Sequence, residues 1–169
     1  MTFDSPIREI SETGAKLLGG RYKIIDFYIS VYIRMKFGKY YDLKAVDGIN
    51  KADIPVLVVH GSNDKTVRYD GAAIINQKKK IKNKHVKYKV MKERGRRGHN
   101  TYLFSKKAIK YINNELNPAY EALWDEYYGT IPEDALVKFF ASADADLVNE
   151  INLELVGDID EFFNKQLAD

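Results

Sequence analysis

The sequence predicts a mixed α/β fold, with a small parallel sheet of about two strands and many helices. Val56–Val59 is a continuous run of apolar, mostly β-branched residues, which is typical of a strand buried on both faces of a parallel sheet. Val86–Met91 alternates apolar residues with lysine, as strands nearer a sheet edge do. Asp70–Lys82, between the two strands, is expected to form a helix of about three turns. This order predicts one right-handed βαβ unit.

Two helices are expected before the first strand. Asp4–Leu18 begins with a capping residue and a proline in its first turn, and it carries a partial apolar stripe. Tyr22–Phe37 carries apolar residues at helical spacing over a broad face, which predicts burial on more than one side. Gly38 is expected to end this second helix.

The segment after the second strand is predicted to be helical throughout. Glu93–Asn100 is expected to be a loop because its glycines permit unusual dihedrals, and it leads into a helix over Thr101–Leu116. Asn117-Pro118 is expected to interrupt this helix and to start another one. Thr130–Glu133 has the spacing of a capping box before a further helix, and Asp158–Leu167 is expected to be a last short helix.

Composition places the chain among ordinary globular proteins. Its 169 residues are 45% hydrophobic and 30% charged, which suits one domain with a real core. No apolar run approaches the roughly 18 residues of a membrane span, and the first residues lack the layout of a signal peptide. We therefore expect a cytoplasmic location. Without cysteine there is no thiolate nucleophile and no cysteine-based metal site.

Charge is distributed unevenly along the chain. Residues 1–112 carry 25 Lys and Arg against 10 Asp and Glu, whereas residues 113–169 carry 2 against 14. The acidic tail is therefore expected to dock on the basic body of its own chain or of a neighbour. Seven lysines lie within residues 78–89. Because no pattern of stacking aromatic residues accompanies them, we expect a solvated surface and not a nucleic-acid site.

Two residues have the types and positions of catalytic groups. Asp64 and His99 are 35 positions apart, and each lies just beyond a predicted parallel strand. A carboxylate there can orient an imidazole, and the imidazole can take the proton of a nucleophile. Taken alone, Asp64 is also a typical turn residue. His60 is expected to pack beneath the loop and His85 to be solvated, and the sequence shows no spacing typical of a metal site.

The motifs around these residues resemble an α/β-hydrolase. Val56–Val67 reads VLVVHGSNDKTV and Gly95–Asn100 reads GRRGHN, and both are similar to the last third of serine esterases and peptidases that have a cap. The resemblance implies that Asp64 is the triad acid and His99 the triad base, and it implies no cofactor. It also makes Tyr22–Tyr41 similar to a cap.

The resemblance predicts how the chain is divided. Residues 1–116 would be the C-terminal part of the hydrolase, with cap-like helices in 1–50 and strand, helix, strand and helix in 54–116. Residues 117–169 would be an acidic helical extension packed on this body.

The chain departs from the hydrolase pattern in one respect, because its nucleophile is missing. None of its six serines lies in a Gly-x-Ser-x-Gly elbow: Ser5, Ser11, Ser30, Ser62, Ser105 and Ser142. We therefore interpret the chain as a C-terminal hydrolase fragment that is inactive alone. The alternative is a non-catalytic assembly or binding module built on the hydrolase remnant. Because so few elements cannot cover a strand that is apolar on both faces, we expect a homo-oligomer, most simply a dimer, or association with the missing N-terminal part.

Overall fold

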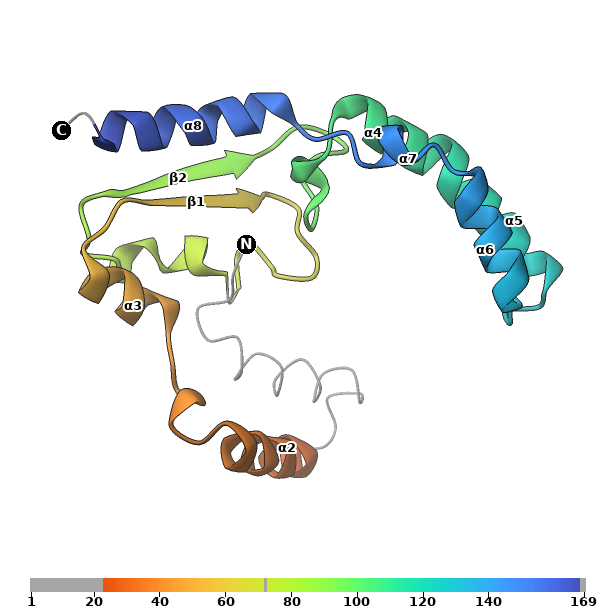
Figure 1. The fold of residues 1–169 in the computed structure, drawn as a ribbon. Coiled ribbons are helices and arrows are strands. Elements are labelled where there is room, and N and C mark those ends of the chain that lie inside the picture. The colour runs from red at the N-terminus through yellow and green to blue at the C-terminus, as the bar shows by residue number, and fades with distance from the viewer. Residues whose placement is uncertain (1–22, 72, 168–169) are drawn as a thin grey trace. The chain divides into compact units, whose positions relative to one another are not determined.

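The computed structural model describes residues 23–71 and 73–167, so the predicted helix over Asp4–Leu18 lies outside the described residues. The chain forms two compact units, Met1–Val90 and Met91–Asp169. The predicted fold class is confirmed, since a two-stranded parallel sheet is combined with a mostly helical chain (Figure 1). Among the residues described, none of the helices combines the length and the hydrophobicity of a transmembrane span.

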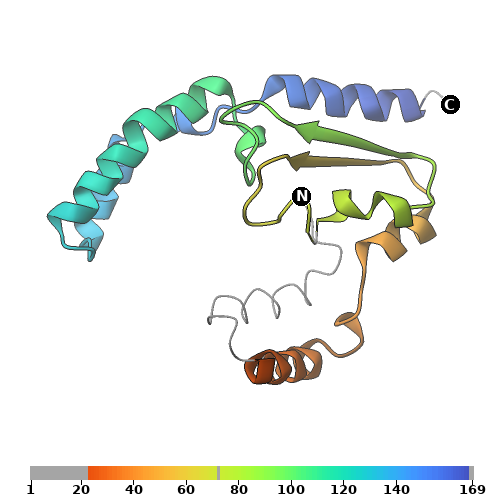
Figure 2. The same ribbon diagram turned by 180° about the vertical axis from the view of Figure 1, so that it is seen from behind.

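The first unit contains the sheet. β1 (Val56–Gly61) and β2 (Val86–Met91) run side by side in the same direction, as both views show (Figures 1 and 2). Both strands lie where the apolar patterns predicted them. Because the strands are parallel, the chain leaves the sheet at the same edge after each of them.

The core of the first unit joins β1 to two short helical elements. α3 (Ala45–Ala52) contributes Val46, and η2 (Ile74–Lys80) contributes Ile74 and Ile75. These side chains pack with Val58 of β1 in one buried cluster. The cluster holds α3 and η2 against the sheet, because burying an aliphatic side chain of this size is worth about 1.5–3 kcal/mol.

The connection between the strands differs from the prediction. The expected helix over Asp70–Lys82 is instead the 3₁₀ helix η2, and residues 62–63 and 65–71 before it form turns. The turns leave only seven residues for the helical part, and 3₁₀ geometry is used in such short pieces. The βαβ unit therefore has a 3₁₀ helix as its crossover. The sequence did not predict α3, whose only buried side chain is that of Val46.

α2 (Lys23–Phe37) agrees with the predicted helix over Tyr22–Phe37, and it ends where expected. Gly38 follows with a φ of 51°, a left-handed conformation that glycine adopts without a steric cost. A short 3₁₀ turn, η1 (Gly38–Tyr40), then leads away from the helix. The broad burial predicted for α2 is wrong, because most of its described side chains are exposed.

The second unit begins with helices that run into one another. After η3 (Thr101–Leu103), α4 (Lys106–Tyr111) continues through a π-helical turn, η4 (Ile112–Leu116), into α5 (Asn117–Glu126). The expected break in the helix at Asn117-Pro118 is wrong because the chain stays helical there, but α5 does begin at Asn117 as predicted. Proline lacks the N–H that would bond to the carbonyl four residues earlier, and a π turn lets the helix pass this position with a shifted hydrogen-bond register.

The acidic tail completes the second unit with α6 (Glu133–Ser142), α7 (Ala145–Val148) and α8 (Leu153–Leu167). The predicted capping box does not form, because Pro132 is the N-cap of α6 and no side chain caps the helix. α8 begins five residues before the predicted Asp158.

The tail packs on the segment that follows β2. Phe104 and Ile151 form an antiparallel bridge, and the backbone N–H of Ser105 donates to the carbonyl of Glu150 across 2.8 Å. The buried side chain of Asn152 donates to the carbonyl of Tyr102 across 2.9 Å. These bonds tie residues 101–105 to residues 150–152. The compact units thus divide the chain at Val90, whereas the sequence predicts a functional division after Leu116.

Candidate functional site

Asp64 lies in the loop directly after β1, and backbone hydrogen bonds hold its carboxylate. Its Oδ1 accepts from the N–H of Thr66 across 2.9 Å and from the N–H of Val67 across 2.8 Å. Its own N–H donates to the carbonyl of Gly61 across 3.3 Å. This is the turn chemistry that aspartate favours, and it fixes the carboxylate in a buried position.

His60 supports the same loop from below. Its ring is fully buried, and Nε2 lies 2.9 Å from the carbonyl oxygen of Val67. Because a carbonyl oxygen only accepts, Nε2 carries the hydrogen. The same Nε2 is 3.7 Å from Oδ2 of Asp64, too far for a hydrogen bond, and Nδ1 has no hydrogen-bond partner among the described residues. His60 is therefore placed as expected of a residue that packs beneath the loop.

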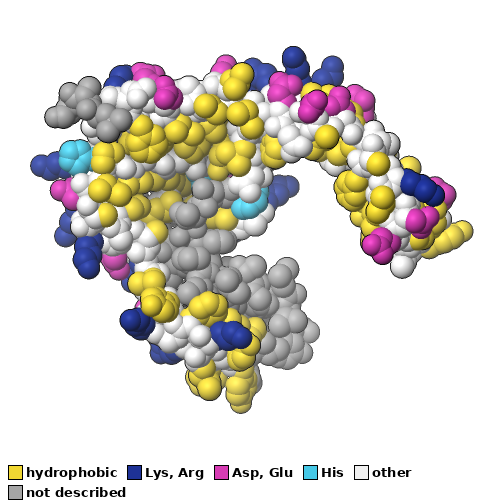
Figure 3. All heavy atoms as spheres, viewed as in Figure 1, with side chains coloured by type: hydrophobic (Ala, Val, Ile, Leu, Met, Phe, Trp, Pro, Cys, Tyr) yellow, Lys and Arg dark blue, Asp and Glu magenta, His cyan; other side chains and the backbone are white. Residues whose placement is uncertain are grey.

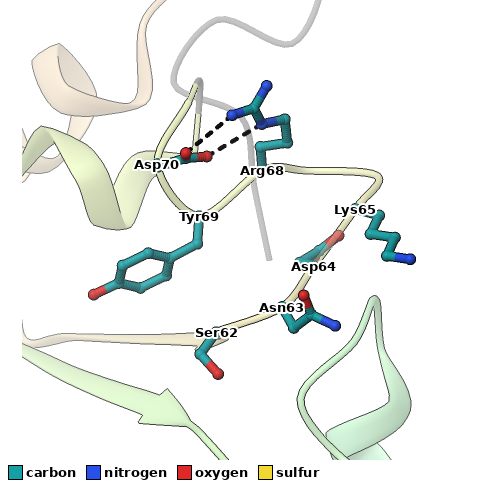
Figure 4. Close-up of a pocket in the computed structure, with 7 residues that line it drawn as sticks. All are labelled: Ser62, Asn63, Asp64, Lys65, Arg68, Tyr69 and Asp70. Carbon is teal, nitrogen blue, oxygen red and sulfur yellow. Dashed lines mark hydrogen bonds and ion pairs between the residues drawn. The ribbon is translucent and has the colours of Figure 1, made fainter.

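A hollow of about 410 Å³ opens beside Asp64 (Figure 4). Its wall is the loop itself, and it is lined by Ser62, Asn63, Asp64, Lys65, Arg68, Tyr69 and Asp70. Arg68 and Asp70 lie side by side and are joined by two hydrogen bonds, of 3.1 and 2.9 Å. The hydrogen bond from Arg68 lowers the pKa of the Asp70 carboxyl below its ordinary value.

His99 lies in the loop after β2, within the second unit. Its side chain is exposed, and its neighbour Asn100 has a φ of 60°. Gly95, earlier in the loop, has a φ of 86°, which explains why glycine is needed there. The N–H of Gly98 donates to Oγ1 of Thr101 across 2.9 Å and closes the turn that presents His99.

Arg96 anchors this loop, a role that no pattern in the sequence predicted. Its side chain is buried and forms ion pairs with Glu93, in the loop, and with Glu154, at the start of α8. Burial opposes the charge of Arg96, but the hydrogen bonds to Glu93 and Glu154 outweigh it and raise the pKa of the guanidinium. Glu93 also pairs with Lys106 at 2.9 Å. The loop that carries His99 is thus held by charges from α4 and α8.

The described serines have roles other than that of an elbow nucleophile. Ser105 is the N-cap of α4, since its Oγ accepts from the N–H of Ala108 across 3.0 Å. Ser142 donates to the carbonyl of Phe139 across 2.7 Å, and Ser30 lies in α2. Ser62 lines the hollow beside Asp64. Ser5 and Ser11 lie outside the described residues.

The structure places the two predicted catalytic residues in different compact units, so their pairing stays a prediction. Within the ranges described, no group of three or more His, Cys, Asp or Glu side chains could hold a metal ion.

Three comparisons with known proteins found no match to this chain: one with models of protein families, one with curated proteins and one with solved structures. The fold and the two loops define a mixed α/β protein with an oriented carboxylate and an exposed imidazole after parallel strands.

Proposed function

We propose that the chain is the C-terminal part of a serine hydrolase of the α/β class, which cleaves a carboxylic ester or an amide. Asp64 is the triad acid, His99 is the triad base, and the nucleophilic serine comes from a segment outside this sequence. The observation that supports this most directly is the anchoring of Asp64, whose carboxylate is buried and held by two backbone N–H groups directly after β1.

Each residue would have a defined part in the reaction. The serine oxygen attacks the carbonyl carbon while His99 takes its proton, and His99 then gives the proton to the leaving alcohol or amine. Asp64 keeps the imidazole in the tautomer that can accept this proton. A buried carboxylate suits this part, since bulk water does not compete for it. The exposure of His99 and the parallel course of β1 and β2 support the same assignment.

The proposal can be tested by joining this chain to the segment encoded before it and measuring the activity of the joined protein. The reading frame that precedes the codon for Met1 should encode an in-frame Gly-x-Ser-x-Gly elbow. Joined to that segment, the protein should hydrolyse a p-nitrophenyl ester, whereas the chain alone should show no turnover above background. We expect His99→Ala to lower kcat by roughly 10⁴-fold or more. His85→Ala is the matched control, because His85 is also exposed but lies before β2.

Two results would contradict the hydrolase proposal. One is the lack of an elbow serine in the preceding reading frame. The other is a completed protein in which His99→Ala and His85→Ala hydrolyse the ester at the same rate.

A second candidate function is a non-catalytic assembly module built on the hydrolase remnant. The observation that favours it is the exposure of large apolar side chains on α2 and on α5 and α6, which Figure 3 shows in part. Exposed apolar side chains gathered on a helix in this way mark interaction sites.

A further inference from the structure

α2 presents apolar side chains to water along one face. We call these five residues the α2 face: Phe27, Tyr28, Val31, Tyr32 and Met35. Their exposed fractions run from 40% for Val31 to 80% for Met35. Their spacing puts them on one side of the helix, because residues four apart are neighbours on a helix surface. Ile29 and Ile33, on another side of α2, are half-buried. The helix thus turns a broad apolar side outward.

A second exposed apolar surface lies on α5 and α6. We call it the hairpin face, and it is a chain of ring contacts formed by Trp124, Tyr120, Phe139 and Phe140. Successive ring centroids are 6.5, 5.6 and 5.3 Å apart. Trp124 is 48% exposed and Phe140 is 62% exposed. Aromatic side chains are enriched at protein interfaces, and this cluster has the composition of one.

The charges around the two faces are opposite in sign. Residues 23–42, which include the α2 face, carry four basic residues and two acidic ones, and one of the basic residues, Arg34, lies 3.3 Å from the carboxylate of Asp42. Residues 117–142, which include the hairpin face, carry five acidic residues and one lysine. The lysine is Lys138, and it lies 3.5 Å from the carboxylate of Asp134 in its own helix. An apolar face with basic neighbours and an apolar face with acidic neighbours are complementary surfaces.

We infer that a second copy of this chain occupies these surfaces, with the α2 face of one copy against the hairpin face of the other. In a two-fold pair this contact is made twice, each copy uses both faces, and the assembly stops at two. A basic helix with exposed aromatic residues could also lie on an anionic membrane. Anionic lipid would repel the acidic hairpin face and leave it uncovered, whereas a second copy covers both. The inference rests on the assembly-module candidate and is independent of the hydrolase proposal.

Charge reversal on each face tests this arrangement. The first variant carries Lys36→Glu and Lys39→Glu, and the second carries Glu121→Lys, Asp125→Lys and Glu126→Lys, which leaves residues 117–142 with four basic and two acidic residues. In either variant alone, like charges would meet at both contacts of the pair. We expect sedimentation velocity to show a dimer for the natural chain. For each variant we expect the dissociation constant of the dimer to be at least about tenfold larger. Leu153→Ser is the control, because Leu153 is 73% exposed but lies outside both faces, and it should leave the dimer intact.

Mixing the two variants is the decisive measurement. One variant then has two acidic faces and the other two basic faces, so a heterodimer of one of each has opposite charges at both contacts. Mixing should restore a 1:1 dimer with nearly the natural dissociation constant, and a variant that failed to fold would not be rescued in this way. The inference is overturned if the natural chain is a monomer at micromolar concentration, or if the mixture stays dissociated. It is equally overturned if the natural chain is monomeric and co-sediments with vesicles of phosphatidylserine and phosphatidylcholine.

Discussion

Oδ1 of Asp64 accepts a hydrogen bond of 2.8 Å from the backbone N–H of Val67, and this bond closes the loop that follows β1. The carbonyl of Val67 in turn accepts from Nε2 of His60 across 2.9 Å. Val67 is therefore fixed from both sides of its peptide backbone, and its side chain is part of the buried core. One carboxylate thus joins a candidate catalytic loop to the hydrophobic interior of the first unit.

Replacing Asp64 should show how much the hydrogen bonds of its carboxylate stabilise the first unit. Asp64→Ala leaves the N–H groups of Thr66 and Val67 without their acceptor, which should lower the free energy of unfolding by about 1–3 kcal/mol. Asp64→Asn retains an oxygen acceptor at Oδ1 and loses the charge, so it should cost less. Urea denaturation and amide hydrogen exchange at Thr66 and Val67 measure the difference. Equal destabilisation by the two substitutions would contradict the assigned hydrogen bonds.

The three histidines should differ in their reaction with diethyl pyrocarbonate. His60 is fully buried, whereas His85 and His99 are exposed. We expect mass spectrometry to find His85 and His99 modified first, and His60 modified only when the first unit opens. The contact between His60 and Val67 should then be lost. Modification of all three at one rate in the folded protein would show that the loop does not cover His60.

The ion pairs at Glu93 should make stability depend on pH. Hydrogen bonds from Arg96 and then Lys106 lower the pKa of the Glu93 carboxyl below its ordinary value of 4.5. A carboxyl whose pKa is lowered by folding adds stability above its unfolded pKa, and this stability is lost as the pH falls through the folded pKa. The natural chain should therefore unfold at a higher temperature than Glu93→Gln at neutral pH. The gap should close as the pH falls below about 4.5.

Calorimetry across this pH range checks the prediction. Asp134→Asn is a suitable control, because Asp134 also pairs with a lysine but lies on the exposed surface of α6, where ion pairs contribute little. A gap that stays constant down to the lowest pH would mean that the charge of Glu93 does not stabilise the loop.

Elements with a strong local pattern were predicted from the sequence. The run of Val56–Val59 and the alternation of Val86–Met91 led to both strands, and glycine marked the end of α2. These predictions succeeded because β-branched residues favour the strand conformation, and glycine permits a positive φ, at their own positions in the chain. α3 was missed, and η2 was expected to be an α-helix. Both elements are short and owe their form to side chains buried in the core of the first unit.

Contacts between distant residues left no such signal. Arg96 reaches Glu154, 58 residues later, and Asn152 reaches back 50 residues to Tyr102. In the sequence, Arg96 and Asn152 look like ordinary polar surface residues. Both are buried, because a partner elsewhere in the chain forms hydrogen bonds with their polar atoms and only a partnered polar group can be buried without a large cost.

The sequence by itself predicted the parallel strands and the loops after them, which the structure confirms, and it singled out Asp64 and His99 as the candidate catalytic residues. It did so because strand periodicity and turn chemistry are local properties. Only the tertiary structure decided that Asp64 is buried and held by backbone N–H groups, that Arg96 anchors the His99 loop, and that α2 faces water with its apolar side. Burial and partnering depend on residues far apart in the chain, which no local pattern specifies.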